Sequence, residues 1–206
     1  MEAHLRAGVA IYNAGHYHAA HDAWEQQWLD LPEGREKRFL QGLIQFTAAV
    51  YHARERNWSG ATGLAGSGRE YLADLPAEFR DVNVGTVRTY LAALETDPER
   101  IERGSPPALT HGGEALALAD LHFEALAVVA AVVAEEGGYD EDVIEQAVEY
   151  ARADIAAGDE GSQFVTLVAD FARDGGNRAV VFQRLAEHVQ RRDHRESDVE
   201  GLFDPE

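Results

Sequence analysis

Apolar residues recur at intervals of three and four along nearly the whole chain, which is the spacing of helices that pack one face against a core. The pattern predicts an all-α protein of antiparallel helical hairpins that form a bundle. The expected helices cover about residues 2–13, 17–29, 36–55, 57–72, 84–95, 121–135, 140–156, 162–173 and 177–192. The third should bury Phe39, Leu40, Leu43, Ile44, Phe46, Thr47 and Val50.

Glycine and proline divide the chain into three parts. Three prolines and three glycines fall within residues 97–113, a composition typical of a connecting segment. We therefore expect a helical-hairpin domain over residues 1–105 and a helical extension over residues 106–192. A small β-hairpin is expected near residues 108–118, where a glycine-containing turn separates two short apolar alternations. Residues 193–206 are acidic and poor in apolar side chains, and we expect a loosely ordered tail there.

The chain is strongly acidic. Asp and Glu number 37 against 18 Lys and Arg, which gives a formal net charge of −19. Such a surface repels itself unless salt screens it, and at about 1 M salt the Debye length falls to about 3 Å. Because the acidic residues are spread along the whole chain, we interpret the charge as adaptation to a saline cytoplasm. The same charge disfavours binding to nucleic acid.

Several classes of protein are excluded by what the sequence lacks. There is no cysteine, so disulfide scaffolds, cysteine-bound metals and thiol nucleophiles are excluded. The first residues lack the charged and apolar pattern of a secretory signal. The longest apolar stretch, residues 125–134, is far shorter than the roughly 20 residues of a membrane span. We expect a cytoplasmic protein with no membrane contact.

One expected helix carries a stripe of residues that could bind a metal ion. His18, His21, Asp22 and Glu25 are spaced i, i+3, i+4 and i+7, so all four share one face of the helix. Imidazole and carboxylate side chains that project from helices are the usual ligands of metal sites in helical bundles. They suit a divalent ion such as zinc, iron, nickel or manganese. We therefore expect His21 and Glu25 as ligands, followed by Asp22 and His18.

A second polar stripe lies on the following helix at Gln41, Gln45 and His52. The short connection around Pro32 should fold the two helices antiparallel, so these side chains could orient the metal ligands by hydrogen bonding. The same residues also permit another interpretation. Histidine, carboxylate and amide side chains can form a buried hydrogen-bonded network that sets the register of the hairpin without any metal.

Four blocks of sequence agree in order and spacing with a known family. They are Asn13-x-Gly15-x-Tyr17-x-x-Ala20-His21-x-x-Trp24-Glu25-x-x-Trp28, Phe39-Leu40-Gln41-Gly42-Leu43-Ile44-Gln45, Tyr51-His52-Ala53-Arg54 and Asn57-x-x-Gly60-Ala61. Over about residues 8–72 the chain resembles the family labelled domain of unknown function 309. The resemblance implies an α-helical fold, a metal role for His21 and Glu25 with Trp28 as the accompanying aromatic, and no known reaction. Many members carry an acid where this chain has His18.

A second resemblance favours a different class of function. Gly15-x-Tyr17-x-x-Ala20 is similar to the second-helix pattern of tetratricopeptide-type hairpins, and Asn57-Trp58-x-x-Ala61 repeats it weakly. The alternative function is thus a helical scaffold for a protein partner or a second copy of the chain.

If a metal is bound with an open coordination position, hydrolysis with Glu25 or Asp22 as the base is conceivable. Enzymatic activity is left open.

Overall fold

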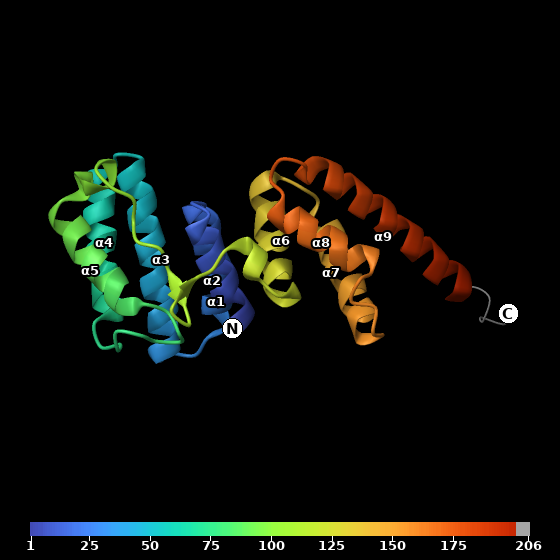
Figure 1. Ribbon diagram of the computed structural model, residues 1–206, viewed down its shortest axis with the longest axis horizontal. Helices are drawn as coiled ribbons and strands as arrows, with labels where there is room; N and C mark the ends of the chain where they lie inside the picture. Colours follow the sequence, from blue (N-terminus) through green and yellow to red (C-terminus); the bar gives the residue numbers. More distant parts are fainter. Residues whose placement is uncertain (201–206) are drawn as a thin grey trace. The chain divides into compact units, whose positions relative to one another are not determined.

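The computed structural model describes residues 1–200, with side chains described through residue 196. Within that part the chain forms nine α-helices, two short 3-10 helices and one two-stranded sheet, which confirms the predicted all-α class (Figure 1). The chain divides into two compact units, Met1–Leu121 and a second that begins at His122. None of the described helices combines the length and the apolar composition that crossing a membrane requires.

The first unit is a series of helices in which each packs against the next one along the chain. They are α1 (Glu2–Asn13), α2 (Tyr17–Asp30), α3 (Arg35–Arg54), α4 (Trp58–Leu72) and α5 (Val84–Thr96). Ring contacts show that α2 and α3 run antiparallel. Arg54 at the end of α3 lies 5.0 Å from the ring centre of Tyr17 at the start of α2, and Lys37 lies 4.8 Å from the ring of Trp28.

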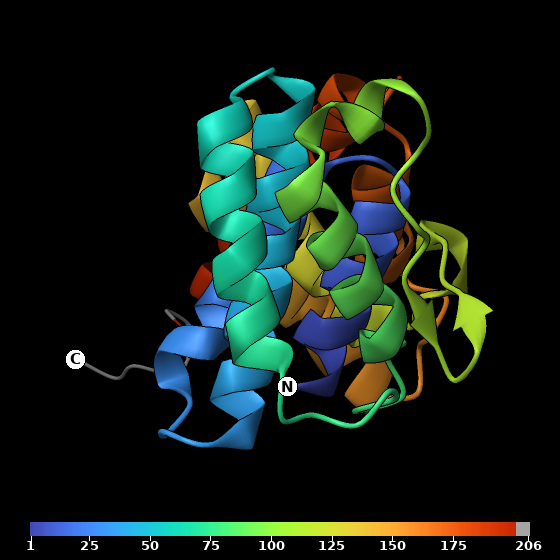
Figure 2. The same ribbon diagram turned by 90° about the vertical axis from the view of Figure 1, so that its left-hand side faces the viewer.

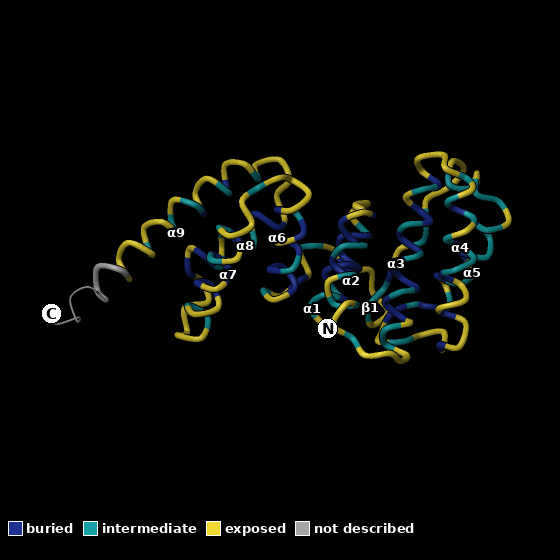
Figure 3. The backbone as a smooth tube through the Cα atoms, turned by 180° about the vertical axis from the view of Figure 1, so that it is seen from behind, coloured by how far each residue is buried: buried dark blue, intermediate teal, exposed yellow. Residues whose placement is uncertain are grey.

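The core of this unit is built around α3, whose predicted apolar face is buried at every expected position. Burial alternates along the helices as the sequence pattern predicts (Figure 3). Helix α4 lies close to α3 at Gly68. A β carbon on this glycine would lie only 3.5 Å from the carbonyl oxygen of Gly42 and 3.3 Å from the β carbon of Gln45. Figure 2 shows α4 and α5 from their outer side.

The predicted β-hairpin is present as β1 (Thr110–His111) and β2 (Glu114–Ala115), paired antiparallel. Its turn is Gly112-Gly113, and both residues have positive φ, +62° and +85°, which matches the right-handed twist of a tight hairpin. A bridge from His111 to Val82 joins the hairpin to the loop before α5.

The segment before and through the hairpin is bound to α1, so the first unit extends to Leu121 instead of ending at residue 105 as expected. The side chain of Asn13 donates hydrogen bonds to the carbonyl oxygens of Leu109 and Leu116, each at 2.9 Å, and accepts one from the Leu109 N–H. The Tyr12 hydroxyl donates to the carbonyl of Pro107 at 3.0 Å. The proline-rich composition marks an irregular segment that packs on the first unit. Two 3-10 helices, η1 (Pro98–Glu102) and η2 (Leu118–Asp120), interrupt it.

The second unit consists of α6 (Phe123–Gly137), α7 (Glu141–Ala156), α8 (Gln163–Arg173) and α9 (Arg178–Glu200). The short α8 packs against the other three and buries Val168 and Phe171 completely. Helix α9 continues to Glu200, so the first part of the segment expected as a loosely ordered tail is helical. Residues 201–206 of that expected tail lie outside the described residues.

One glycine substitution tests how closely α1 packs against α2, and a second, in α4, is its control. A β carbon on Gly8 would overlap the fully buried indole of Trp24, so we expect Gly8→Ala to lower the free energy of unfolding by about 1–3 kcal/mol. A β carbon on Gly63 in α4 would have no atom within 4 Å. Gly63→Ala should therefore raise the free energy of unfolding by up to about 1 kcal/mol, because alanine favours a helix more than glycine does. Urea unfolding of both variants measures the difference. Equal effects would contradict the close contact.

Candidate functional site

The candidate site lies along one edge of α2. The helix buries Ala19, Ala20, Ala23 and Trp24, and the indole Nε1 of Trp24 donates to the carbonyl of Leu5 at 3.3 Å, which ties α2 to α1. With Trp24 turned inward, the next residues around the helix fall at the boundary between core and solvent. Asp22 and His21 are accordingly 20% and 29% exposed, and Glu25 is 47% exposed. An ion from solvent can therefore reach this edge.

The structure brings together all four residues of the predicted stripe, with Asp22 at the centre. His18 Nδ1 lies 3.0 Å from one carboxylate oxygen of Asp22, and His21 Nδ1 lies 2.9 Å from the other. His21 Nδ1 is also 3.7 Å from Glu25 Oε2. One ligand atom each from His21, Asp22 and Glu25 can be chosen so that all lie within 4.8 Å of one another.

These contacts shift the protonation of the cluster. The hydrogen bond to Asp22 raises the pKa of His21 above its usual value, against the effect of partial burial, and the negative charge of Glu25 adds to the rise. Burial alone would raise the pKa of Asp22, but its hydrogen bond with His21 and the charge of His18 outweigh burial and lower it. Asp22 is thus held ionised, and His21 binds its proton more tightly than a free imidazole.

The residues expected to orient the ligands make other contacts. His52 Nδ1 lies 2.9 Å from the side-chain nitrogen of Asn57, the residue that caps α4 by accepting from the Gly60 N–H. Gln45 faces α4 at Gly68. The stripe on α3 is therefore turned toward α4. The ring of Tyr51 on α3 lies 6.1 Å from that of His18, between ring centres, and no role at the site was expected for Tyr51 from the sequence.

The other two expected supporting residues are Gln41 on α3 and Trp28 on α2. Gln41 is half-buried on α3, one turn before Gln45. Trp28 is half-buried and supports Lys37, which also pairs with Glu33 at 3.3 Å. Trp28 thus helps to hold the α2–α3 connection. A role of either residue in orienting a metal ligand stays a prediction.

Comparison with known proteins places this edge of α2 within a recognised segment. Residues 5–64 match the family model described as Domain of unknown function (DUF309). The resemblance inferred from the sequence is thereby confirmed, and the DUF309 segment runs from α1 into α4 and includes the whole cluster.

Two curated relatives are also similar to the chain. An uncharacterized protein of Aquifex aeolicus (strain VF5) is 27% identical over 107 residues, which are 52% of this chain and 31% of that protein. The uncharacterized protein YpuF of Bacillus subtilis (strain 168) is 32% identical over 74 residues, 36% of this chain and 41% of that protein. The chain thus spans less than half the length of these relatives, and the name of neither relative states an activity.

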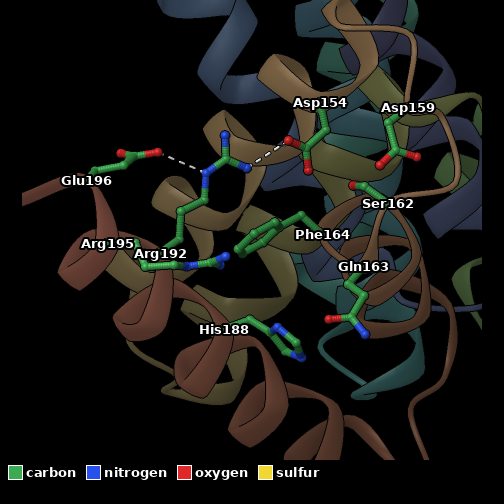
Figure 4. A pocket seen from close by; sticks show the side chains of 9 residues that line it. All are labelled: Asp154, Asp159, Ser162, Gln163, Phe164, His188, Arg192, Arg195 and Glu196. Carbon is green, nitrogen blue, oxygen red and sulfur yellow. Dashed lines mark hydrogen bonds and ion pairs between the residues drawn. The ribbon is translucent and has the colours of Figure 1, made fainter. Parts of the chain in front are cut away.

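A cavity of about 690 Å³ lies in the second unit among α7, α8 and α9, and the sequence analysis missed it (Figure 4). Arg192 is only 22% exposed and bonds Asp154 at 2.7 Å and Glu196 at 3.0 Å. Its guanidinium also lies 4.2 Å from the ring centre of Tyr150. The i, i+4 spacing of Arg192 and Glu196 was visible in the sequence, but the contact with α7 was not. These bonds fasten α9 to α7.

The protonation of His21 gives a direct test of the cluster. In metal-free protein we expect the pKa of His21 to lie above 6.5 and to fall in Asp22→Asn, because the neutral amide no longer favours the imidazolium. The stabilisation from this bond should be complete below about pH 6.5 and be lost as the pH rises through the folded-state pKa. NMR titration of the imidazole signals with a chelator present measures it. An unchanged His21 midpoint in Asp22→Asn would contradict the assignment.

Proposed function

We propose that this protein binds a divalent metal ion on α2 through His21, Asp22 and Glu25, with His18 as a further donor. The observation that carries the proposal is the proximity of three potential ligand atoms within 4.8 Å of one another. Bonds of 2.0–2.2 Å in a tetrahedral site place neighbouring ligand atoms about 3.3–3.6 Å apart. The distances of 2.9 and 3.7 Å from His21 Nδ1 to Asp22 and Glu25 bracket that range.

The charges around the cluster support the same proposal. Within the described residues, the ion pairs of Asp22 and Glu25 are made with histidines and not with arginine or lysine. When the imidazoles are neutral, two carboxylates are left without a fixed positive charge beside them. A divalent cation supplies that charge, and an imidazole–carboxylate set suits zinc, iron, nickel or manganese.

The partial exposure of the site bears on its chemistry. Three protein donors at a surface edge leave room for water, and a bound metal with an open position would lower the pKa of that water and support hydrolysis. Glu25, the most exposed of the three proposed ligands, is the residue best able to leave the metal and act as a base. Asp22 is held by two histidines and is better suited to remain in place.

The alternative function is a tetratricopeptide-like scaffold in which the cluster is a structural network. The consecutive packing of α1 to α5 favours it, since repeat scaffolds stack helical hairpins in this way. The exposure of the cluster weighs against the scaffold, for which we expect a buried network. The side chain of His18 is 65% exposed and that of Glu25 is 47% exposed. A metal-free protein would favour the scaffold and direct the search toward a protein partner or a homo-oligomer.

Metal binding can be tested by calorimetric titration of zinc into untagged, chelator-stripped protein. We expect one ion per chain, and a loss of affinity of at least about 100-fold in His21→Ala and in Glu25→Ala, since even residues that only support a ligand are worth 10–100-fold. His16→Ala is the matched control, because His16 is exposed at the start of α2 and makes no side-chain cap bond. Absence of uptake of zinc, iron, nickel and manganese, or binding unchanged in both variants, would refute the metal site.

We also propose that the charge of −19 is an adaptation to a saline cytoplasm. Mutual repulsion of the acidic residues should destabilise the fold at low salt and be screened at high salt. We therefore expect the melting temperature to rise as potassium chloride increases from about 0.1 M to about 1 M, where the Debye length shortens from about 10 to about 3 Å. Chloride is preferred to sulfate, which strengthens apolar burial in any protein. A melting temperature that stays level or falls would contradict the proposal.

A further inference from the structure

A second groove lies in the first unit, between α5 and the segment from η1 to Pro107, and has a volume of about 430 Å³. Figure 2 shows this segment leaving η1 and passing down beside α5. The walls combine one cation, the hydroxyls of two threonines and one tyrosine, and an apolar surface. The residues involved are Arg100, Thr86, Thr89, Tyr90, Ala93 and Pro107.

The charge of this groove is the reverse of the charge of the chain. Among the described side chains that line it, Arg100 is the one charged group, whereas the chain as a whole carries −19. Three carboxylates near Arg100 in the sequence are already paired with other arginines. The pairs are Asp97 with Arg103, Glu102 with Arg56 and Glu95 with Arg69. In the described part of the chain, no carboxylate lies within ion-pair distance of the Arg100 guanidinium.

Arg100 is held in place without being neutralised. Its guanidinium carbon lies 5.0 Å from the ring centre of Tyr90, a cation–π contact, and its side chain is half-buried. A stacked guanidinium keeps its N–H groups in the plane of the fork, where they can donate to both oxygens of a carboxylate. The guanidinium is thus ordered and still able to bind an anion.

Tyr90 completes a wall that does not repel a negative charge. The residue is 8% exposed, and burial raises the pKa of its hydroxyl, so the ring stays neutral at physiological pH. Its buried hydroxyl has no hydrogen-bond partner among the described residues. The rings of Tyr90 and Pro107 and the methyl group of Ala93 offer an apolar surface beside the cation.

We propose that this groove binds a small organic monocarboxylate, with Arg100 holding the carboxylate and the surface of Tyr90, Ala93 and Pro107 covering the apolar body. One unpaired guanidinium matches one negative charge, whereas inorganic phosphate would bring more charge than the groove offers and no apolar surface. The Thr86 hydroxyl, exposed on the first turn of α5, is a further polar group of the wall. The site is independent of the α2 cluster.

Benzoate is the probe that tests the proposal, titrated into the full-length protein at constant potassium chloride and followed by amide NMR shifts. We expect saturable shifts centred on α5, and binding at least about tenfold weaker in Arg100→Gln, the loss expected for a charge-assisted hydrogen bond. Arg103→Gln is the matched control, because it removes an arginine of the same segment that is already paired with Asp97. Benzamide, which has the same shape without the charge, should bind at least as weakly to the native protein as benzoate binds to Arg100→Gln.

A second variant separates loss of binding from loss of folding. Ala93→Leu fills the groove without touching its charge, and should abolish the benzoate shifts while the circular dichroism melt remains cooperative. The proposal is overturned if benzoate gives no saturable shifts on α5, or if Arg100→Gln and Arg103→Gln bind it equally. It is also overturned if benzamide or inorganic phosphate binds as well as benzoate does.

Discussion

The burial of Trp24 is the constraint on which the candidate site depends. Its indole occupies the space that Gly8 leaves open on α1, and its Nε1 donates to the carbonyl of Leu5. Because successive residues of a helix are separated by about 100°, this one contact sets the rotation of α2 about its axis. His21 and Asp22 are then placed at the edge of the core, where they are partly desolvated but still open to solvent. If these two side chains were fully buried, the loss of hydration of their charges would destabilise the fold. If they were fully exposed, the interaction between them would be too weak to keep them in contact.

Both proposed sites can be explained by how the charged side chains of the first unit are paired. Most described carboxylates that make ion pairs in the first unit do so with arginine, as Asp97 does with Arg103. The two proposed sites depart from this pattern. On α2, Asp22 and Glu25 are paired with histidines, so the local charge depends on protonation and leaves room for a cation. Beside α5, Arg100 has a tyrosine ring in place of a carboxylate, which leaves room for an anion.

Much of this arrangement could be predicted from the sequence because helical periodicity determines which residues share a face. The stripe from His18 to Glu25 is an example, since four residues within two turns of one helix must lie together. The hairpin was predicted as well, because Gly112-Gly113 supplies the positive φ that its turn requires.

The features that the sequence does not reveal are contacts between elements distant in sequence. The rotation of α3 is set by its packing on α4 at Gly68, which turns Gln45 toward that helix, and no local pattern contains this information. The first unit extends to Leu121 because hydrogen bonds between Asn13 and Leu109 bind a proline-rich segment whose composition is typical of a linker. The burial of Arg192 likewise requires Asp154 of another helix.

The most direct measurement for the central claim is anomalous X-ray diffraction from crystals of the zinc-loaded protein, collected on both sides of the zinc absorption edge. We predict one strong anomalous peak per chain within bonding distance of His21 Nδ1 and of carboxylate oxygens of Asp22 and Glu25, with the His21–Asp22 hydrogen bond replaced by bonds to the metal. A map with no peak on α2 and with the 2.9 Å hydrogen bond between His21 and Asp22 intact would contradict it. The cluster would then be a structural network of the hairpin.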